Sequence, residues 1–230
     1  MKFRTKNLIK NIISAILVTL IMIVGFFSIT GIVFNIVYIP APVYSFSMYP
    51  TLNQDAPNLE TAGDYAYLNK FADYSNNDIV IANVSWYDKA IIKRLIACPN
   101  DILEIRDENT NYVLYVNEKL VYKKEKNDNC SLHNGLHSSS GTNGYYQHYL
   151  TMLEKNPSKV VEDSNGNKCF KLDKNEYFLM GDHWEGSTDC IEKGPVSKDE
   201  ILGKVDFVIP MKENRFWGML KHMVTTIFKI

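Results

Sequence analysis

The sequence predicts a mostly β fold, in which an amino-terminal transmembrane helix is followed by an antiparallel, many-stranded β domain with a polar insertion. Three observations support this prediction. Residues 11–54 contain no Asp, Glu, Lys or Arg, and residues 12–38 are almost wholly apolar. Beyond residue 60, short runs rich in β-branched and aromatic residues alternate with polar turns. Residues 123–168 are dominated by Lys, Asn, Ser and Gly, which is typical of an insertion on a β scaffold.

The first expected element is a membrane anchor over residues 11–38. Its apolar run is longer than the ~20 residues that cross a bilayer core as a helix, and a cleaved signal peptide has an apolar region of only about 7–15 residues. The segment 1–10 carries four basic residues, Lys2, Arg4, Lys6 and Lys10. Because residues 39–54 carry no positive charge, the positive-inside rule places 1–10 in the cytoplasm and the remaining chain outside the cell membrane.

The second expected element is an extracytoplasmic β domain over residues 39–213, long enough for one domain with a sizeable core. We expect a tight hairpin turn at Asn117-Glu118 and a helix over 144–154 within the insertion. The expected strands are 64–69, 78–85, 90–96, 102–106, 112–116, 119–122, 169–172, 176–180 and 204–209.

Residues 214–230 are the last expected element, an amphipathic helix that packs on the domain or lies at the membrane interface. The formal net charge of the chain is -1, and the sequence has no basic stripe. The composition therefore argues against nucleic acid as a partner.

One candidate for chemistry directly follows the anchor, in the segment Ser45-Phe46-Ser47-Met48-Tyr49-Pro50-Thr51. Pro50 disfavours the helical conformation for Tyr49, so the segment is expected to be extended or turning. The segment is either a solvated juxtamembrane loop or a displayed serine nucleophile.

A second candidate is Lys93, in the predicted strand 90–96. Side chains alternate between the faces of a strand, so Lys93 shares a face with Ile91 and Leu95, and Arg94 lies on the other face. If the face of Lys93 is buried, desolvation lowers the lysine pKa and allows the neutral amine to act as a general base toward a serine. The alternative is an exposed lysine on an edge strand.

The third candidate is the polar loop 181–190 at the end of a predicted strand. It contains hydroxyls and carboxylates that could orient a neighbouring lysine or arginine, although Gly, Asp, Ser and Thr are also ordinary turn residues.

Together these segments resemble bacterial type I signal peptidases. In that family a Ser-x-Ser-Met-x-Pro-Thr motif holds the nucleophile, which matches Ser47. The hydroxyl of Ser45 then joins the Ser47 backbone N–H in the oxyanion hole. The family's Lys-Arg-x-x-Gly-x-Pro-Gly-Asp motif aligns with residues 93–101, so the resemblance gives Lys93 the role of general base.

The family's Gly-Asp-Asn-Arg-x-x-Ser-x-Asp-Ser-Arg motif matches at Gly181, Asp182, Ser187 and Asp189. The resemblance implies that the Ser187 hydroxyl orients the lysine and that Asp182 pairs with Arg94.

The chain also departs from these family motifs. Ala97 and Asn100 replace two glycines, although Asn tolerates a left-handed backbone. His183 and Trp184 replace an Asn-Arg pair. Ile191 replaces the final Arg, so Asp189 is expected to lack the cationic partner that it has in the family.

The resemblance implies a membrane-bound serine endopeptidase that removes signal peptides from exported preproteins. It would cleave after small residues of the Ala-x-Ala type with a Ser-Lys dyad and without a metal or other cofactor. Its expected partners are membrane lipid and the signal peptides of preproteins that emerge from the export machinery. The alternative is a non-catalytic relative that assists the assembly of surface proteins; loss of the serine or the lysine would then be expected, and both are retained.

Three further alternatives stay open from the sequence. His183 could replace Lys93 as the base. Cys130, His133 and His137 could bind a metal, although a tight structural zinc site needs four ligands. Cys130 and Cys169 could form a disulfide across the insertion.

Overall fold

The computed structural model of the chain describes residues 2–56, 63–125 and 141–228. These residues belong to two compact units, residues 1–39 and 40–230. Cys130, His133 and His137 lie outside the described residues. The metal-binding alternative therefore stays a prediction. Cys169 is a described residue and is a free, buried thiol whose Sγ donates to the Asn167 carbonyl at 3.5 Å, which argues against its pairing with Cys130.

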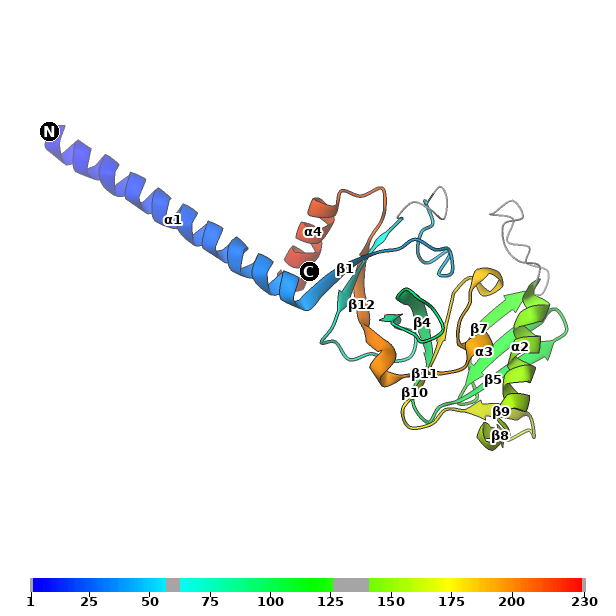
Figure 1. Cartoon of the computed structure of the whole chain (residues 1–230). Helices are drawn as coiled ribbons and strands as arrows, with labels where there is room; N and C mark the ends of the chain where they lie inside the picture. Colours follow the sequence, from blue (N-terminus) through cyan, green and yellow to red (C-terminus); the bar gives the residue numbers. More distant parts are fainter. Residues whose placement is uncertain (1, 57–62, 126–140, 229–230) are drawn as a thin grey trace. The chain divides into compact units, whose positions relative to one another are not determined.

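The first unit consists almost entirely of helix α1 (Lys2–Val37), drawn in blue in Figure 1. Its segment Ile9–Val37 has a mean hydropathy of 2.8 and is the one helix in the described part of the chain that is long and apolar enough to cross a membrane. The hydroxyls of Thr19 and Thr30 donate to the carbonyls of Ala15 and Phe26. These two hydroxyls are thus hydrogen-bonded within the helix, which lowers the cost of placing them in a hydrocarbon environment.

The second unit contains two antiparallel sheets, which confirms the predicted mostly β fold (Figure 1). The seven-stranded sheet comprises, in spatial order, β1 (Tyr38–Pro42), β2 (Tyr65–Asn69), β12 (Ile201–Ile209), β3 (Ile79–Ala82), β4 (Ile91–Ala97), β10 (Glu176–Met180) and β11 (Val196–Ser197). The five-stranded sheet comprises β7 (Lys119–Glu125), β6 (Asn111–Val116), β5 (Ile102–Glu108), β9 (Lys168–Lys171) and β8 (Val160–Glu162).

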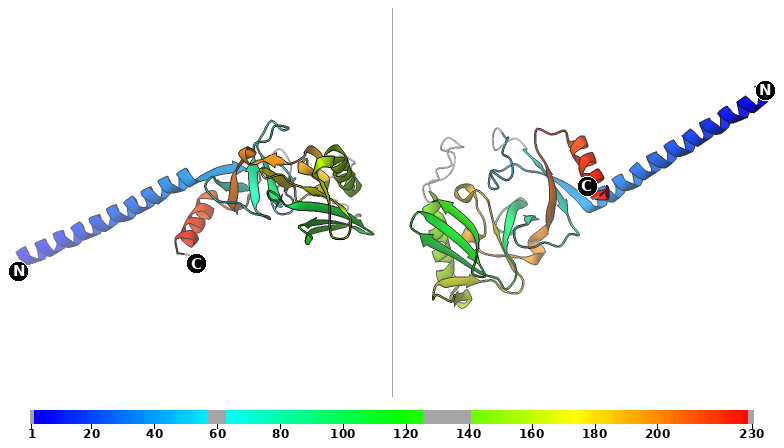
Figure 2. Two further views of the ribbon diagram at one scale, coloured as in Figure 1. Left: turned by 90° about the horizontal axis from the view of Figure 1, so that it is seen from below. Right: turned by 180° about the vertical axis from the view of Figure 1, so that it is seen from behind.

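The helices of this unit are short. Those in its described residues are α2 (Gly141–Lys155), α3 (Cys190–Lys193), α4 (Arg215–Phe228) and the 3-10 turns Pro157–Lys159, Trp184–Gly186 and Lys198–Glu200. Helix α2 lies against β5 and β9 of the five-stranded sheet (Figure 2). Helix α4 packs on β12, where Gly218 meets Ile209 and the His222 ring stacks on the Phe207 ring with centroids 3.6 Å apart.

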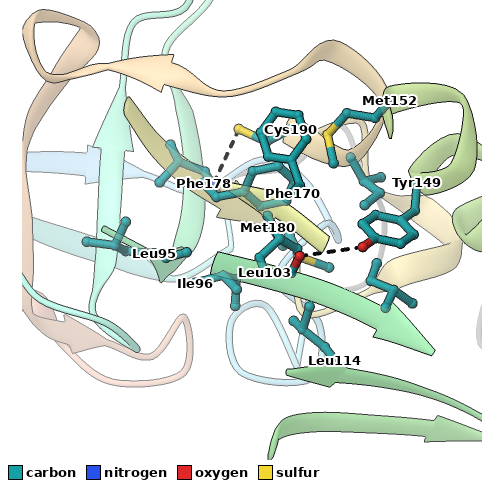
Figure 3. Close-up of a cluster of buried hydrophobic side chains, with 14 of the residues drawn as sticks. Leu95, Ile96, Leu103, Leu114, Tyr149, Met152, Phe170, Phe178, Met180 and Cys190 are labelled. Atoms are coloured by element: carbon teal, nitrogen blue, oxygen red, sulfur yellow. Dashed lines mark hydrogen bonds between the residues drawn. The ribbon is translucent and has the colours of Figure 1, made fainter. Parts of the chain in front are cut away.

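One hydrophobic core joins the two sheets and helix α2 (Figure 3). Leu95 and Phe178 enter it from the seven-stranded sheet, and Leu103 and Phe170 from the five-stranded sheet. Tyr149 of α2 is 1% exposed, and its hydroxyl donates to the Leu103 carbonyl at 3.5 Å. The insertion predicted from the sequence therefore supplies part of the main core.

Two tight turns depend on left-handed backbone conformations. Asn117 and Glu118 have φ of 50° and 63°, the positive values that a two-residue type I′ hairpin turn requires between β6 and β7. Asn100 has φ of 68° after β4, so asparagine does adopt the conformation expected where the family has glycine. The substitution at Ala97 falls inside β4, where no special conformation is needed.

Candidate active site

The segment 45–51 forms a turn that is packed into the domain and is not a solvated loop. The Tyr49 N–H donates to the Phe46 carbonyl at 2.9 Å, and Leu52 N–H donates to the Met48 carbonyl at 2.9 Å. Met48 is 0% exposed, and its side chain joins a second core cluster. These contacts fix the backbone of Ser47, whose side chain is buried.

Asn53 braces the chain on the amino-terminal side of this turn. Its side-chain N–H groups donate to the carbonyls of Val43 at 3.0 Å and Ser45 at 2.8 Å. Its backbone N–H donates to the Asp64 carboxylate at 2.8 Å, and its side-chain oxygen accepts from the Asp64 N–H at 2.8 Å. Asn53 is buried, with φ of 60°, and its hydrogen bonds hold the backbone that leads to Ser45 and Ser47 in place.

Lys93 lies on β4, an interior strand between β3 and β10, and is 4% exposed. It faces Val80 of β3 in register, and Leu95 lies on the same face of β4. The exposed edge-strand alternative is therefore wrong. Burial lowers the pKa of Lys93 to about 8, against the opposing effects of the Asp189 and Asp182 carboxylates.

The Lys93 Nζ and the Ser47 Oγ are joined by a hydrogen bond of 2.5 Å. When the amine is neutral, the same short contact lets the serine hydroxyl donate to Nζ, which is the geometry required of a general base and its nucleophile. The Ser45 Oγ lies 3.2 Å from the Ser47 Oγ, so both predicted serine hydroxyls point toward one region.

Arg94 occupies the opposite face of β4, as alternation predicts, and forms a bidentate ion pair with Asp182. Its Nε and Nη2 donate to the two carboxylate oxygens at 2.7 and 2.6 Å, and Nη1 donates to the Asn77 carbonyl at 2.8 Å. The Thr51 hydroxyl donates to the same carboxylate at 2.5 Å. This pair thus links β4 to the loop after β10 and to the end of the serine turn.

Gly181, the residue after β10, brings that loop against Ser47. A Cβ at this position would lie 2.4 Å from the Ser47 carbonyl oxygen and 2.2 Å from the Ser187 Oγ, so only glycine fits. The backbone N–H of His183 donates to the Ser47 carbonyl at 3.0 Å. The loop therefore holds the backbone of Ser47.

Asp189 is 0% exposed, and its carboxylate accepts four hydrogen bonds. Its Oδ2 accepts from the Gly181 N–H at 2.8 Å, the Ser187 Oγ at 2.7 Å and the Tyr145 hydroxyl at 2.5 Å, and its Oδ1 accepts from the Ile191 N–H at 3.2 Å. Burial raises the pKa of Asp189, whereas these donors and the charge of Lys93 act in the opposite direction.

The structure brings all the site residues predicted from the sequence into one region: Ser45, Ser47, Lys93, Arg94, Asp182, Ser187 and Asp189. Two residues that support the site were not predicted from the sequence. Asn53 follows the recognised motif by only two residues. Tyr145 lies in the insertion, and no motif connects it to Asp189.

One cluster in the described residues has the composition of a metal site, Glu104, Asp163 and Cys169. The Arg106 guanidinium already pairs with the two carboxylates, at 2.7 Å to Glu104 and 2.8 Å to Asp163. The cluster is thus accounted for as an ion-pair network on the five-stranded sheet.

Comparison with known families gives an extensive match. The family described as "Signal peptidase, peptidase S26" matches residues 8–210. The chain is 28% identical over 183 residues to Signal peptidase I T of Bacillus subtilis strain 168, which covers 76% of both chains. It is also 28% identical over 214 residues to Signal peptidase IB of Staphylococcus aureus, covering 92% of this chain and 91% of the relative.

Among solved structures, the chain is similar to a signal peptidase I from Enterococcus faecalis V583. The sequence identity is 18% and the TM-score 0.35, over 58% of this chain and 97% of the other.

Proposed function

This chain belongs to the signal peptidase family, peptidase S26, and from that premise we propose that Ser47 and Lys93 are its catalytic dyad. Family membership makes the protein a membrane-anchored peptidase that removes signal peptides. The observation that carries the assignment of the dyad is the 2.5 Å hydrogen bond between the Lys93 Nζ and the Ser47 Oγ inside a buried site.

The first chemical step is acylation. The Ser47 Oγ attacks the carbonyl carbon of the scissile peptide bond while its proton passes to the neutral Nζ of Lys93. The negative oxygen that forms is stabilised by the Ser47 backbone N–H and the Ser45 hydroxyl; loss of one such donor costs about 100-fold or more in rate. The C–N bond then breaks, and the proton on Lys93 passes to the departing amine, which becomes the amino terminus of the mature protein.

The second step is deacylation. A water molecule attacks the serine ester and gives its proton to Lys93. The ester C–O bond breaks, the signal peptide leaves with a free carboxylate, and the lysine returns the proton to Ser47. Lys93 must be neutral at the start of each step, so its burial serves the chemistry directly.

The supporting residues act on the orientation of the dyad. Ser187 donates to Asp189, and both belong to the loop whose His183 N–H donates to the Ser47 carbonyl. The Arg94–Asp182 pair fixes the same loop from the other face of β4. We infer that Ser187 and Asp189 position the lysine, and that Arg94 and Asp182 fix the distance between β4 and the loop.

The anchor supplies proximity to the substrate. With the amino terminus in the cytoplasm and the catalytic unit outside, Ser47 follows the apolar segment by about ten residues, so a site on that surface meets signal peptides that emerge from the membrane-embedded export machinery. A small residue of the Ala-x-Ala type before the scissile bond completes the proposed specificity. Protease digestion of intact and opened vesicles tests this topology.

Two alternatives are less favoured. His183 contacts the nucleophile through its backbone N–H, whereas the serine hydroxyl bonds to Lys93. A non-catalytic assembly role receives no support from the relatives, whose names are those of peptidases.

The proposed function is tested with the full-length protein in phospholipid vesicles and a preprotein that has Ala at positions -1 and -3. We expect one cut directly after the -1 alanine, measured by mass spectrometry of both products. A preprotein with Phe at -1 is the matched control and should stay uncut. If neither preprotein is cut, or if both are cut equally, the proposal is wrong.

A further inference from the structure

The buried Asp189 has an unusual source for one of its donors. Three donors converge on its Oδ2, and two of them, Gly181 and Ser187, come from the same loop as Asp189. The third, the Tyr145 hydroxyl at 2.5 Å, comes from helix α2 in the insertion, 44 residues earlier in the chain. An oxygen that accepts three donors has the pattern of an ionised carboxylate, which can only accept.

Tyr145 is held firmly at this position. Its side chain is buried, and its ring stacks on the Trp184 ring with centroids 5.0 Å apart and planes 14° apart. The Trp184 ring is in turn 4.9 Å from the Tyr122 ring of β7. The aromatic contacts fix the tyrosine ring, so its hydroxyl is aimed at Asp189 without freedom to turn away.

This arrangement resolves two departures from the family motifs. The motif arginine at position 191 is an isoleucine that is 1% exposed and packs in the main core, so it offers no charge to Asp189. The motif arginine at position 184 is a tryptophan that packs against Tyr145. Where the motif would supply a cation from the loop, this chain supplies a neutral hydroxyl from the insertion.

We propose that Tyr145 is a positioning residue of the active site, which fixes the Asp189 carboxylate and through it Ser187 and Lys93. The proposal rests on the proposed function and extends it, because it gives helix α2 a part in catalysis. Tyr145 touches neither the substrate nor the reacting atoms. Its effect reaches the dyad through the charge and the orientation of one carboxylate.

Loss of the Tyr145 hydroxyl should change the pH dependence of the reaction. The negative charges that act on Lys93 are those of the Asp189 and Asp182 carboxylates, because burial raises the pKa of the Cys190 thiol and keeps it uncharged. With one donor fewer, the buried Asp189 is ionised less readily, so its negative charge favours the lysine ammonium less. Loss of the Tyr145 hydroxyl therefore lowers the pKa of Lys93 and moves the rising limb of the pH–rate profile to lower pH.

The test compares Tyr145→Phe with Tyr149→Phe in the full-length protein in detergent micelles. Both tyrosines lie on α2 and are buried, but the Tyr149 hydroxyl donates to the backbone carbonyls of Leu103 (Figure 3) and Lys168, whereas the Tyr145 hydroxyl donates to Asp189. The readouts are kcat and kcat/KM from pH 6 to 10 on a fluorogenic signal-sequence peptide, with thermal unfolding as the check on folding.

For Tyr145→Phe we expect a limb displaced to lower pH and a plateau kcat reduced about tenfold, as for one lost hydrogen bond to a charged group. Tyr149→Phe should keep the wild-type limb. If both variants keep it, Tyr145 has only a structural role and the proposal is overturned. If the wild type cleaves the peptide, Ser47→Ala does not, and both tyrosine variants keep the wild-type limb, this inference is wrong and the proposed function stands.

A second variant does not depend on how Tyr145→Phe folds. Incorporation of 3-fluorotyrosine at position 145 keeps the ring and its stacking but makes the hydroxyl a stronger donor. The charge on Asp189 is then stabilised, and the limb should move to higher pH. A limb that stays at its wild-type position, or that moves to lower pH, contradicts the proposal.

Discussion

If Lys93 is the general base, as we propose, its burial sets the pH dependence of cleavage. With a pKa of about 8, about 1% of Lys93 is neutral at pH 6 and about 90% at pH 9. An exposed lysine of pKa about 10.4 would have less than about 0.1% of its amine neutral at pH 7. Burial therefore raises the neutral fraction of the Lys93 amine at pH 7 by more than about 100-fold.

The perturbation is a change of pH from 6 to 9, and the assay is kcat/KM of the full-length protein on a peptide with Ala at -1 and -3. We expect kcat/KM to rise about 90-fold over this range and then to level, with a slope of one on a logarithmic plot. A limb centred near pH 6.5 would indicate a histidine base such as His183. A limb that still rises at pH 10 would show that Lys93 is not desolvated, and either result would refute the reasoning.

Three further substitutions test the support of the site. Gly181→Ala would place a Cβ 2.4 Å from the Ser47 carbonyl oxygen, so kcat/KM should fall about 100-fold while circular dichroism stays unchanged; activity within threefold of wild type would contradict the close approach. Asn53→Ala removes the two side-chain hydrogen bonds to the carbonyls of Val43 and Ser45 and should lower the free energy of unfolding by about 2 kcal/mol, measured by urea denaturation. An unchanged free energy of unfolding would show that packing alone holds the turn. Asp182→Asn breaks the half-buried ion pair with Arg94 and should lower the free energy of unfolding by about 1–2 kcal/mol. An unchanged midpoint of urea denaturation would show that the pair does not stabilise the fold.

Local signals in the sequence predicted much of the fold and the core of the site. Nine strands were expected from short apolar runs, and the alternation along β4 placed Lys93 and Arg94 on opposite faces. The strands β1, β8 and β11 were missed. β1 contains two prolines, and β8 and β11 have three and two residues, so none of them carries a full alternating pattern.

The rest of the site depends on packing between distant segments. The sequence indicates that Asp189 lacks its cation, but it gives no reason to choose Tyr145 as the replacement. That choice follows from the way α2 packs on α3 and on the 3-10 turn that contains Trp184. Asn53 was missed for another reason, since an isolated asparagine in a loop gives no sign that its side chain will bridge two backbone carbonyls.

The most direct test of the Ser-Lys dyad is the cleavage of an Ala-x-Ala preprotein by vesicles that contain the wild type, Ser47→Ala or Lys93→Ala, at equal amounts of inserted protein. Ser85→Ala and Lys89→Ala, at exposed positions, are the matched controls. We predict that the two dyad variants abolish cleavage and that both controls cleave at the wild-type rate. Near-normal cleavage by Lys93→Ala or by Ser47→Ala would contradict the assignment of the dyad.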